Sequence, residues 1–203
     1  MIKLNVGCGQ VFLKGYTNID SDTIEQILER YGGKDLEVFK RFPDTFEKVY
    51  NYDVFNLPYK DGEVDEILCE GFLEHLSFEE EGKFLFDAKR VLKVNGLFHF
   101  TVPDFDSLAR QWLEAEDDFK EFYKVGTDEH WFGNWSRTLD NKWGYLTAFI
   151  FGNQNGTGQF HRNAYTVKKI CKMMSSLDFS YQLSFFNFKN TKAKMIECKA
   201  FKR

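Results

Sequence analysis

The chain has 203 residues and a formal net charge of −4, with 43% hydrophobic and 29% charged residues. This length is enough for one well-filled α/β domain spanning 1–203 and too short for two full domains, and the composition is typical of a globular protein. No segment approaches the roughly 18 uninterrupted apolar residues that a membrane span requires, and the amino terminus lacks a secretory leader pattern, so we expect a cytoplasmic protein without a membrane span.

Strands alternate with helices along the chain, which favours a parallel sheet covered by helices. Apolar runs bounded by turn residues mark the strands, and apolar residues at helical spacing mark the helices. In chain order we expect strands at 2–6 and 16–19, a helix at 23–30, strands at 48–55 and 64–69, a helix from 78, a strand at 97–102, helices at 104–124 and 166–177, and strands at 181–188 and 194–201.

The helix that begins at residue 78 has the clearest signals. Ser77 and Glu80 form a capping box, and Asn95-Gly96 is expected to end the helix. The last two strands flank a polar turn and predict an antiparallel hairpin. The fold class is therefore α/β, a Rossmann-like, doubly wound, mostly parallel sheet with a C-terminal antiparallel β-hairpin and helices on both faces.

An aromatic-rich insertion or lid is expected at about 104–165, irregular from 125 onwards. It contains all four tryptophans of the chain, Trp112, Trp131, Trp135 and Trp143. Rings stack well on flat ligand faces such as those of sugars, so this cluster could form the wall of an acceptor site. It could equally form the private core of the lid, because tryptophan is rarely exposed.

Charge is spread unevenly along the chain. Residues 160–203 carry ten Lys and Arg against two acids, a local charge of +8, which leaves −12 on the rest. A basic segment can contact an anionic acceptor, although such lysines often form only solvated faces. The acidic remainder argues against a broad phosphate-binding surface and so against a nucleic-acid partner. The cysteines form no C-x-x-C pair, which predicts free thiols and no metal site; they are Cys8, Cys69, Cys171 and Cys198.

A glycine turn, Gly7-Cys8-Gly9, follows the first buried strand. Missing Cβ atoms let such a turn approach a ligand closely and present backbone N–H groups to it. A dinucleotide site would carry a third glycine where this chain has Phe12, which weakens a pyrophosphate interpretation.

Asp20 lies 11 residues after Gly9, at the end of the second expected strand. An acid at this place can accept hydrogen bonds from both hydroxyls of a ribose bound over the glycine turn. The alternative is that Asp20 caps the helix that starts near Thr23.

Several segments together resemble class I S-adenosylmethionine-dependent methyltransferases, in particular the branch associated with polysaccharide biosynthesis. Two features depart from the pattern: the chain between Gly9 and Gly15 is too short for the usual first helix, and Asp178 replaces a glycine. The segments that carry the resemblance are LNVGCG (4–9), GYTNID (15–20), YDVFNLPYKDGEVDEILCEGFLEHL (52–76), RVLKVNGLFHFTVPD (90–104) and, more weakly, HRNAYTVKKICKMMSSLDF (161–179).

The resemblance implies a binding site for S-adenosyl-L-methionine. The glycine turn would approach the methionine end of the cofactor, and Asp20 would hold the ribose. Asp53 and the backbone of Val54 would contact the adenine. Glu70 and Gly71 would lie beside the methionine moiety and the acceptor. The complete set is Gly7, Cys8, Gly9, Asp20, Asp53, Val54, Glu70 and Gly71.

Two histidines are candidate catalytic residues. His161 follows a glycine-rich stretch, and an imidazole can take a proton from an acceptor hydroxyl. His75 could act as a base or hold the acceptor, or it could only order the loop before Ser77. For His161 the alternative is a solvent-exposed loop histidine.

We therefore expect a methyltransferase that uses S-adenosylmethionine to O-methylate a sugar or another small molecule, with no metal. One alternative is a binding module that holds the cofactor without catalysis. Another is a nicotinamide-dependent sugar-modifying oxidoreductase, for which Tyr165 and Lys169 supply a Tyr-x-x-x-Lys pair. The sequence does not identify the acceptor. It also leaves the oligomeric state open, with a homodimer as one option.

Overall fold

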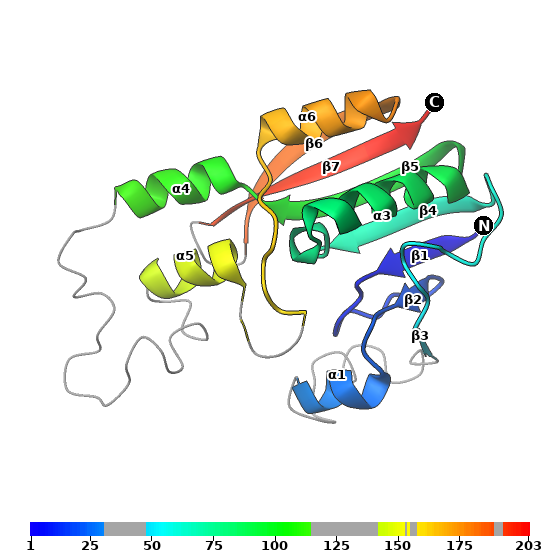
Figure 1. Cartoon of the computed structure of the whole chain (residues 1–203), viewed down its shortest axis with the longest axis horizontal. Helices are drawn as coiled ribbons and strands as arrows, with labels where there is room; N and C mark the ends of the chain where they lie inside the picture. The colour runs from blue at the N-terminus through cyan, green and yellow to red at the C-terminus, as the bar shows by residue number, and fades with distance from the viewer. Residues whose placement is uncertain (31–47, 115–141, 153, 155–157, 189–192) are drawn as a thin grey trace.

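A computed structural model describes residues 1–30, 48–114, 142–152, 154, 158–188 and 193–203 (Figure 1). These residues form a seven-stranded sheet in the order β3-β2-β1-β4-β5-β7-β6 with helices around it. The strands are β1 (Lys3–Val6), β2 (Thr17–Ile19), β3 (Val49–Tyr50), β4 (Val64–Glu70), β5 (Leu92–Pro103), β6 (Phe179–Asn187) and β7 (Lys194–Lys202). The helices are α1 (Ile24–Arg30), η2 (Leu73–His75, a single 3-10 turn), α3 (Phe78–Val91), α4 (Phe105–Leu113), α5 (Lys142–Phe151) and α6 (Val167–Ser176).

Strand direction confirms the expected fold class. The pairs from β3 to β5 are all parallel, and β7 runs antiparallel to both β5 and β6. The strand order reverses at β1, which has β2 on one side and β4 on the other. In sheets of this kind, ligands bind outside the carboxyl ends of the strands at the reversal point. The loops that follow β1, β2 and β4 therefore surround the expected site.

The main core lies between the sheet and the helices that cover it. Phe98 and Phe100 of β5 are almost completely buried, and their rings are 5.0 Å apart between centroids. One face of α3 packs on this sheet through buried apolar residues at helical spacing, Phe84, Leu85, Ala88 and Val91.

The capping box of α3 is confirmed, whereas its predicted end is wrong. Ser77 Oγ accepts from the Glu80 N–H, and the Glu80 carboxylate accepts from the Ser77 N–H. The helix ends at Val91, before Asn95-Gly96, because Leu92 is buried, takes an extended conformation and already pairs with Val64. Residues 93–96 then bulge out before regular pairing resumes at Leu97.

Two further expectations need correction. The expected strand at 48–55 is paired only at Val49–Tyr50, because the following residues leave the sheet in a loop. The stretch 125–165 is not irregular throughout, since α5 occupies Lys142–Phe151. No helix occurs between Gly9 and Gly15, as expected from the short spacing.

A second, smaller core joins α4, α5 and the start of β7. Leu108, Leu146 and Ala193 are fully buried there, and Trp112 packs against them. For Trp112, the interpretation as a core residue is thus supported. About half of the expected aromatic lid, including Trp131 and Trp135, lies outside the described residues, as does the side chain of Trp143.

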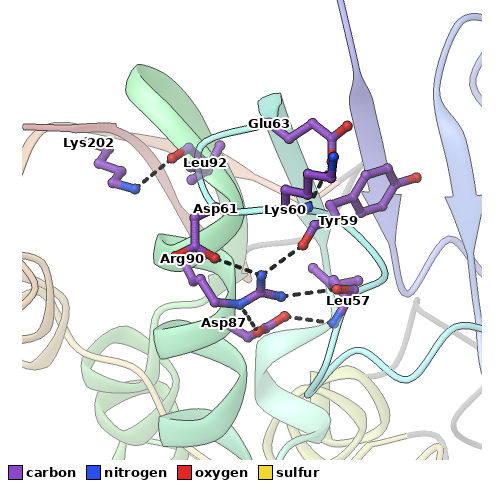
Figure 2. Close-up of polar contacts among 9 residues, drawn as sticks. All are labelled: Leu57, Tyr59, Lys60, Asp61, Glu63, Asp87, Arg90, Leu92 and Lys202. Carbon is purple, nitrogen blue, oxygen red and sulfur yellow. Dashed lines mark hydrogen bonds and ion pairs between the residues drawn. The ribbon is translucent and has the colours of Figure 1, made fainter.

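Arg90 of α3 fastens the loop that connects β3 to β4 (Figure 2). Its guanidinium donates to the carbonyl oxygens of Leu57 (3.0 Å) and Tyr59 (2.8 Å), and its Nε donates to Asp87 (2.7 Å). The other oxygen of Asp87 accepts from the Leu57 N–H at 2.7 Å. This cluster holds the loop that carries Asp53.

The four cysteines are free thiols, as predicted. Among the described residues, none of the helices combines the length and the apolar character needed to cross a bilayer.

Candidate functional site

A cavity of about 810 Å³ opens at the carboxyl ends of β1, β2 and β4. It lies at the reversal point of the strand order, where the fold predicts a ligand. All the cofactor-binding residues implied by the resemblance and both candidate catalytic histidines line it: Gly7, Cys8, Gly9, Asp20, Asp53, Val54, Glu70, Gly71, His75 and His161.

The glycine turn forms the floor of the cavity after β1. Gly7 takes a φ of +67°, which favours glycine, and a Cβ there would lie 2.4 Å from Cδ2 of Phe72. The Cys8 N–H donates to the Ile19 carbonyl at 3.0 Å and so ties the turn to the end of β2. Burial raises the pKa of the Cys8 thiol, which is therefore neutral and packs beside Phe12. This packing role explains why Phe12 stands where a dinucleotide site would have glycine.

Asp20 belongs to the cavity and does not cap α1. Its Oδ2 accepts from the Gly9 N–H at 2.7 Å, and its Oδ1 accepts from the Asp22 N–H at 3.0 Å. The cap of α1 is made instead by Thr23 and Gln26, each of which accepts from the backbone N–H of the other. The carboxylate of Asp20 is thus held at the edge of the glycine turn, which is where the sequence resemblance predicts the ribose.

Asp53 sits on the opposite loop. Its Oδ1 accepts from the Phe55 N–H at 2.9 Å, a local turn that fixes the direction of the carboxylate. Asn51 links this loop to Asp20, because its side-chain amide donates to the Asp20 carbonyl at 2.9 Å. The two acids expected to hold the ribose and the adenine are therefore positioned by connected loops.

His75 and His161 meet at another part of the cavity wall. Their ring centroids are 4.8 Å apart, and the rings stand edge to face. Nδ1 of His75 lies 3.1 Å from the Phe160 carbonyl oxygen, and Nδ1 of His161 lies 2.7 Å from the Phe149 carbonyl oxygen. His161 is therefore not a solvent-exposed loop histidine: it is partly buried and oriented.

Burial sets the protonation of this histidine pair and of the neighbouring Glu74. It lowers the pKa of His161 to about 4, assisted by the nearby His75, and it lowers the pKa of His75. Burial also raises the pKa of Glu74, which is 3% exposed, to about 8. Both imidazoles are thus neutral at neutral pH.

Backbone and side-chain bonds fix the segment after His161 against η2 and α3. The Glu74 carbonyl accepts from the N–H groups of Arg162 and Asn163, at 2.8 and 3.1 Å. The Arg162 guanidinium donates to Glu80 at 2.7 Å. Gly152 lets this segment approach α5, because a Cβ there would lie 2.0 Å from the Gln159 carbonyl oxygen.

Glu81, which the sequence did not indicate, and Tyr165, which the sequence offered only as part of a Tyr-x-x-x-Lys pair, are structural residues beside the site. The Tyr165 hydroxyl, fully buried, bonds to the Glu81 carboxylate and to the Leu73 carbonyl. Lys169 pairs with Glu81 at 2.8 Å. These contacts join residues more than eighty positions apart, so no local pattern could reveal them.

The basic C-terminal region is partly neutralised within the chain. Arg162 pairs with Glu80, Lys169 with Glu81, and Lys202 donates to the Leu92 carbonyl. These cations therefore serve packing, which favours the structural interpretation of the basic segment.

Part of the chain is similar to known methyltransferase domains. A family model described as a methyltransferase domain matches residues 4–100. An uncharacterized protein of Methanocaldococcus jannaschii is 33% identical over 121 residues, which cover 60% of this chain and 48% of that protein. The chain thus spans about half the length of this curated relative.

Solved structures share the fold at low sequence identity. The PH0226 protein of Pyrococcus horikoshii OT3 is 15% identical, with a TM-score of 0.57 over 99% of this chain and 81% of that one. A Burkholderia thailandensis 1,6-didemethyltoxoflavin-N1-methyltransferase, solved with 1,6-didemethyltoxoflavin and S-adenosylhomocysteine, is 13% identical, with a TM-score of 0.56 over 99% and 70%. An S-adenosylmethionine-dependent methyltransferase of Methanosarcina mazei is 15% identical, with a TM-score of 0.56 over 98% and 92%.

The matched domain and the shared fold support S-adenosylmethionine as the cofactor. The residues of the cavity suit this molecule: a close-approach glycine turn, a fixed acid beside it and a second acid on the facing loop. The chain has the class I S-adenosylmethionine-dependent methyltransferase fold, and its residues 4–100 match a methyltransferase domain.

Proposed function

We propose that this protein is a methyltransferase that transfers the methyl group of S-adenosylmethionine to a hydroxyl of a sugar or a related small molecule. The observation that carries the proposal is the convergence of the glycine turn, Asp20, Asp53 and the histidine pair on one cavity. The proposed cofactor contacts are those expected from the sequence, with Asp20 at the ribose, Asp53 and Val54 at the adenine, and the glycine turn with Glu70 and Gly71 at the methionine end.

The chemistry needs positioning more than activation. The bound cofactor supplies an electrophilic methyl group on a sulfonium. Placing an acceptor oxygen in line with the carbon–sulfur bond and excluding water can supply roughly 7–11 kcal/mol in well-aligned cases. The oxygen lone pair forms the new O–C bond, the C–S electrons stay on sulfur, and the hydroxyl proton leaves.

His161 is the proposed acceptor of that proton, with His75 beside it. Because Nδ1 of His161 faces a carbonyl oxygen, it must carry the ring proton, and Nε2 keeps a free lone pair. An imidazole that is neutral at neutral pH is in the form that a base requires.

The aromatic wall near the histidines favours a sugar-like acceptor. Phe149 and Phe188 both line the cavity, with ring centroids 5.1 Å apart, and Phe149 adjoins His161 through its carbonyl. Aromatic faces bind the apolar faces of sugar rings. The similarity to the polysaccharide-associated branch and the free thiols suit a reaction on a saccharide precursor in the cytoplasm.

The contacts of Tyr165 and Lys169 argue against the oxidoreductase alternative, which requires both side chains in the cavity. The Tyr165 hydroxyl is fully buried and bonded to Glu81, and Lys169 is paired with Glu81, so neither group is presented to the cavity. A module that only binds the cofactor would show no methyl transfer, so a measurement of turnover distinguishes it from an enzyme.

A transfer assay tests the proposal. The protein is incubated with methyl-labelled S-adenosylmethionine and a panel of sugars and nucleotide sugars, and label in each acceptor is measured. We expect transfer to a saccharide, reduced about 10²–10⁴-fold in His161→Gln. His99→Gln, which alters a histidine on β5 paired with Glu197, is the matched control and should leave the rate unchanged. Label found only in protein or RNA would overturn the saccharide assignment.

A further inference from the structure

Three ligand-type side chains meet at the acceptor end of the cavity. Glu74, His75 and His161 each offer one oxygen or nitrogen atom, and these atoms all lie within 4.8 Å of one another. All three residues line the cavity. They come from two distant segments, the 3-10 turn η2 and the segment after α5, where Phe160 next to His161 forms a single bridge with Gly152.

Both imidazoles are oriented as metal-binding histidines are. Each Nδ1 faces a backbone carbonyl oxygen, which can only accept, so each Nδ1 carries the proton. The lone pair of each ring is therefore on Nε2. Histidines that bind metals almost always donate their other ring N–H to a carbonyl or carboxylate in this way, which fixes tautomer and orientation.

Glu74 supplies an oxygen that lacks a partner. Its side chain is 3% exposed, and its Oε2 forms no hydrogen bond among the described residues. The neighbouring cations are engaged elsewhere, since Arg162 binds Glu80 and Lys169 binds Glu81. A buried carboxyl oxygen without a partner is costly, and a bound cation would compensate it.

We propose that Glu74, His75 and His161 together bind one divalent transition-metal cation, of the class that includes Zn²⁺, Mn²⁺ and Fe²⁺. Bonds of about 2.0–2.2 Å separate two ligand atoms by at most about 4.0–4.4 Å, so a small rotation of these side chains closes the site. Two imidazoles and one carboxylate suit these cations, whereas Mg²⁺ and Ca²⁺ prefer oxygen ligands. Three protein ligands leave coordination positions for a further molecule.

The cation would position the acceptor hydroxyl for methyl transfer. This part of the proposal rests on the proposed function. The acceptor oxygen would occupy an open coordination position, and the cation would make its proton more acidic. In the metal-loaded protein the nitrogens of the histidine pair are ligands, so His161 no longer takes the hydroxyl proton as it would without the cation, and the proton leaves to solvent. The methyl carbon then moves from sulfur to the metal-bound oxygen, and the C–S electrons remain on sulfur.

Metal titration of the purified chain tests the site without any acceptor. After removal of metals with a chelator, Co²⁺ is added and its visible absorption is followed; Zn²⁺ is titrated by calorimetry. We expect one equivalent of each, competing for one site, with affinity at least about tenfold lower in Glu74→Gln and His75→Gln. His99→Gln is the matched control, because its ring also faces a carboxylate but lies on β5, away from the cluster.

Circular dichroism of each variant checks that it is folded, and either site variant suffices if the other fails to fold. A titration without saturable Co²⁺ absorption, or an affinity equal in both site variants and wild type, would overturn the proposal. Cofactor binding is measured in parallel with S-adenosylhomocysteine. If Co²⁺ binds and S-adenosylhomocysteine does not, the proposed function fails and the metal site stands; the reverse result removes the metal site alone.

Discussion

At the scale of single residues, the glycine turn can pack against the end of β4 only because Gly7 has no side chain. Gly7 needs a left-handed φ, and it also lies directly against the ring of Phe72, which continues from the end of β4. The turn, the end of β4 and the cavity floor therefore fit together only without a Cβ at this position. Gly15 has a similar φ of +81° but open space around it.

Gly7→Ala is expected to lower the free energy of unfolding by about 2–4 kcal/mol. The left-handed conformation contributes about 1–2 kcal/mol and the overlap with Phe72 the rest. Gly15→Ala is the matched control and should lose only the conformational part. Urea denaturation of both variants measures the difference, and equal losses would show that the contact with Phe72 is unimportant.

At the scale of elements, α3 holds the loop between β3 and β4 and thereby places Asp53. Among the described residues the loop has no strand partner for its backbone carbonyls, and Arg90 takes that role. Its guanidinium donates to two loop carbonyls and to one acid of its own helix (Figure 2). The Asp87 side chain is largely buried and would lose its charged partner without Arg90. The loop is thus stabilised by a side chain and not by a sheet.

Arg90→Ala should lower the free energy of unfolding by about 2–3 kcal/mol, since hydrogen bonds to a charged group contribute about 1.5–3 kcal/mol and the variant leaves Asp87 without its cationic partner. Lys83→Ala, on the same helix, removes an exposed ion pair with Glu79. It should change the free energy of unfolding by less than about 0.5 kcal/mol. Chemical denaturation compares the two, and similar losses would mean that the loop is held by other contacts.

At the scale of the whole molecule, strand order brings distant loops to one cavity. The loops after β1, β2 and β4 meet there because these strands are parallel neighbours, and the segment that contains His161 and follows α5 in the chain also lines the cavity. A ligand that contacts all of these loops binds only the folded chain. Binding therefore raises the free energy of unfolding of the whole chain.

Thermal unfolding with S-adenosylhomocysteine at 100 times its dissociation constant should show an increase of about 5–10 °C in the midpoint. This corresponds to about 2.7 kcal/mol of stabilisation for a chain of this size. Asp20→Asn should need about 10–100 times more ligand for the same increase, because the charged acceptor for the ribose hydroxyls is lost. NAD is the comparison ligand, and an equal increase with NAD would contradict the cofactor assignment.

Local patterns predicted most of the elements and the cofactor half of the site. The capping box at Ser77, the hairpin near the carboxyl end and the Gly7 and Asp20 spacing all depend on neighbours within about a dozen residues. The errors arose where long-range pairing decided the outcome. Leu92 leaves α3 early because it pairs with Val64, and α5 forms where its apolar residues pack against α4.

The sequence by itself therefore determined the α/β alternation, the glycine turn and the identity of the acids, since these follow from local backbone preference and hydrophobic period. Only the tertiary structure decided that Glu74, His75 and His161 adjoin and that Tyr165 and Arg162 hold them there. The physical reason is that these contacts join segments more than eighty residues apart, and burial in the folded chain alone gives their polar groups the protonation and orientation described.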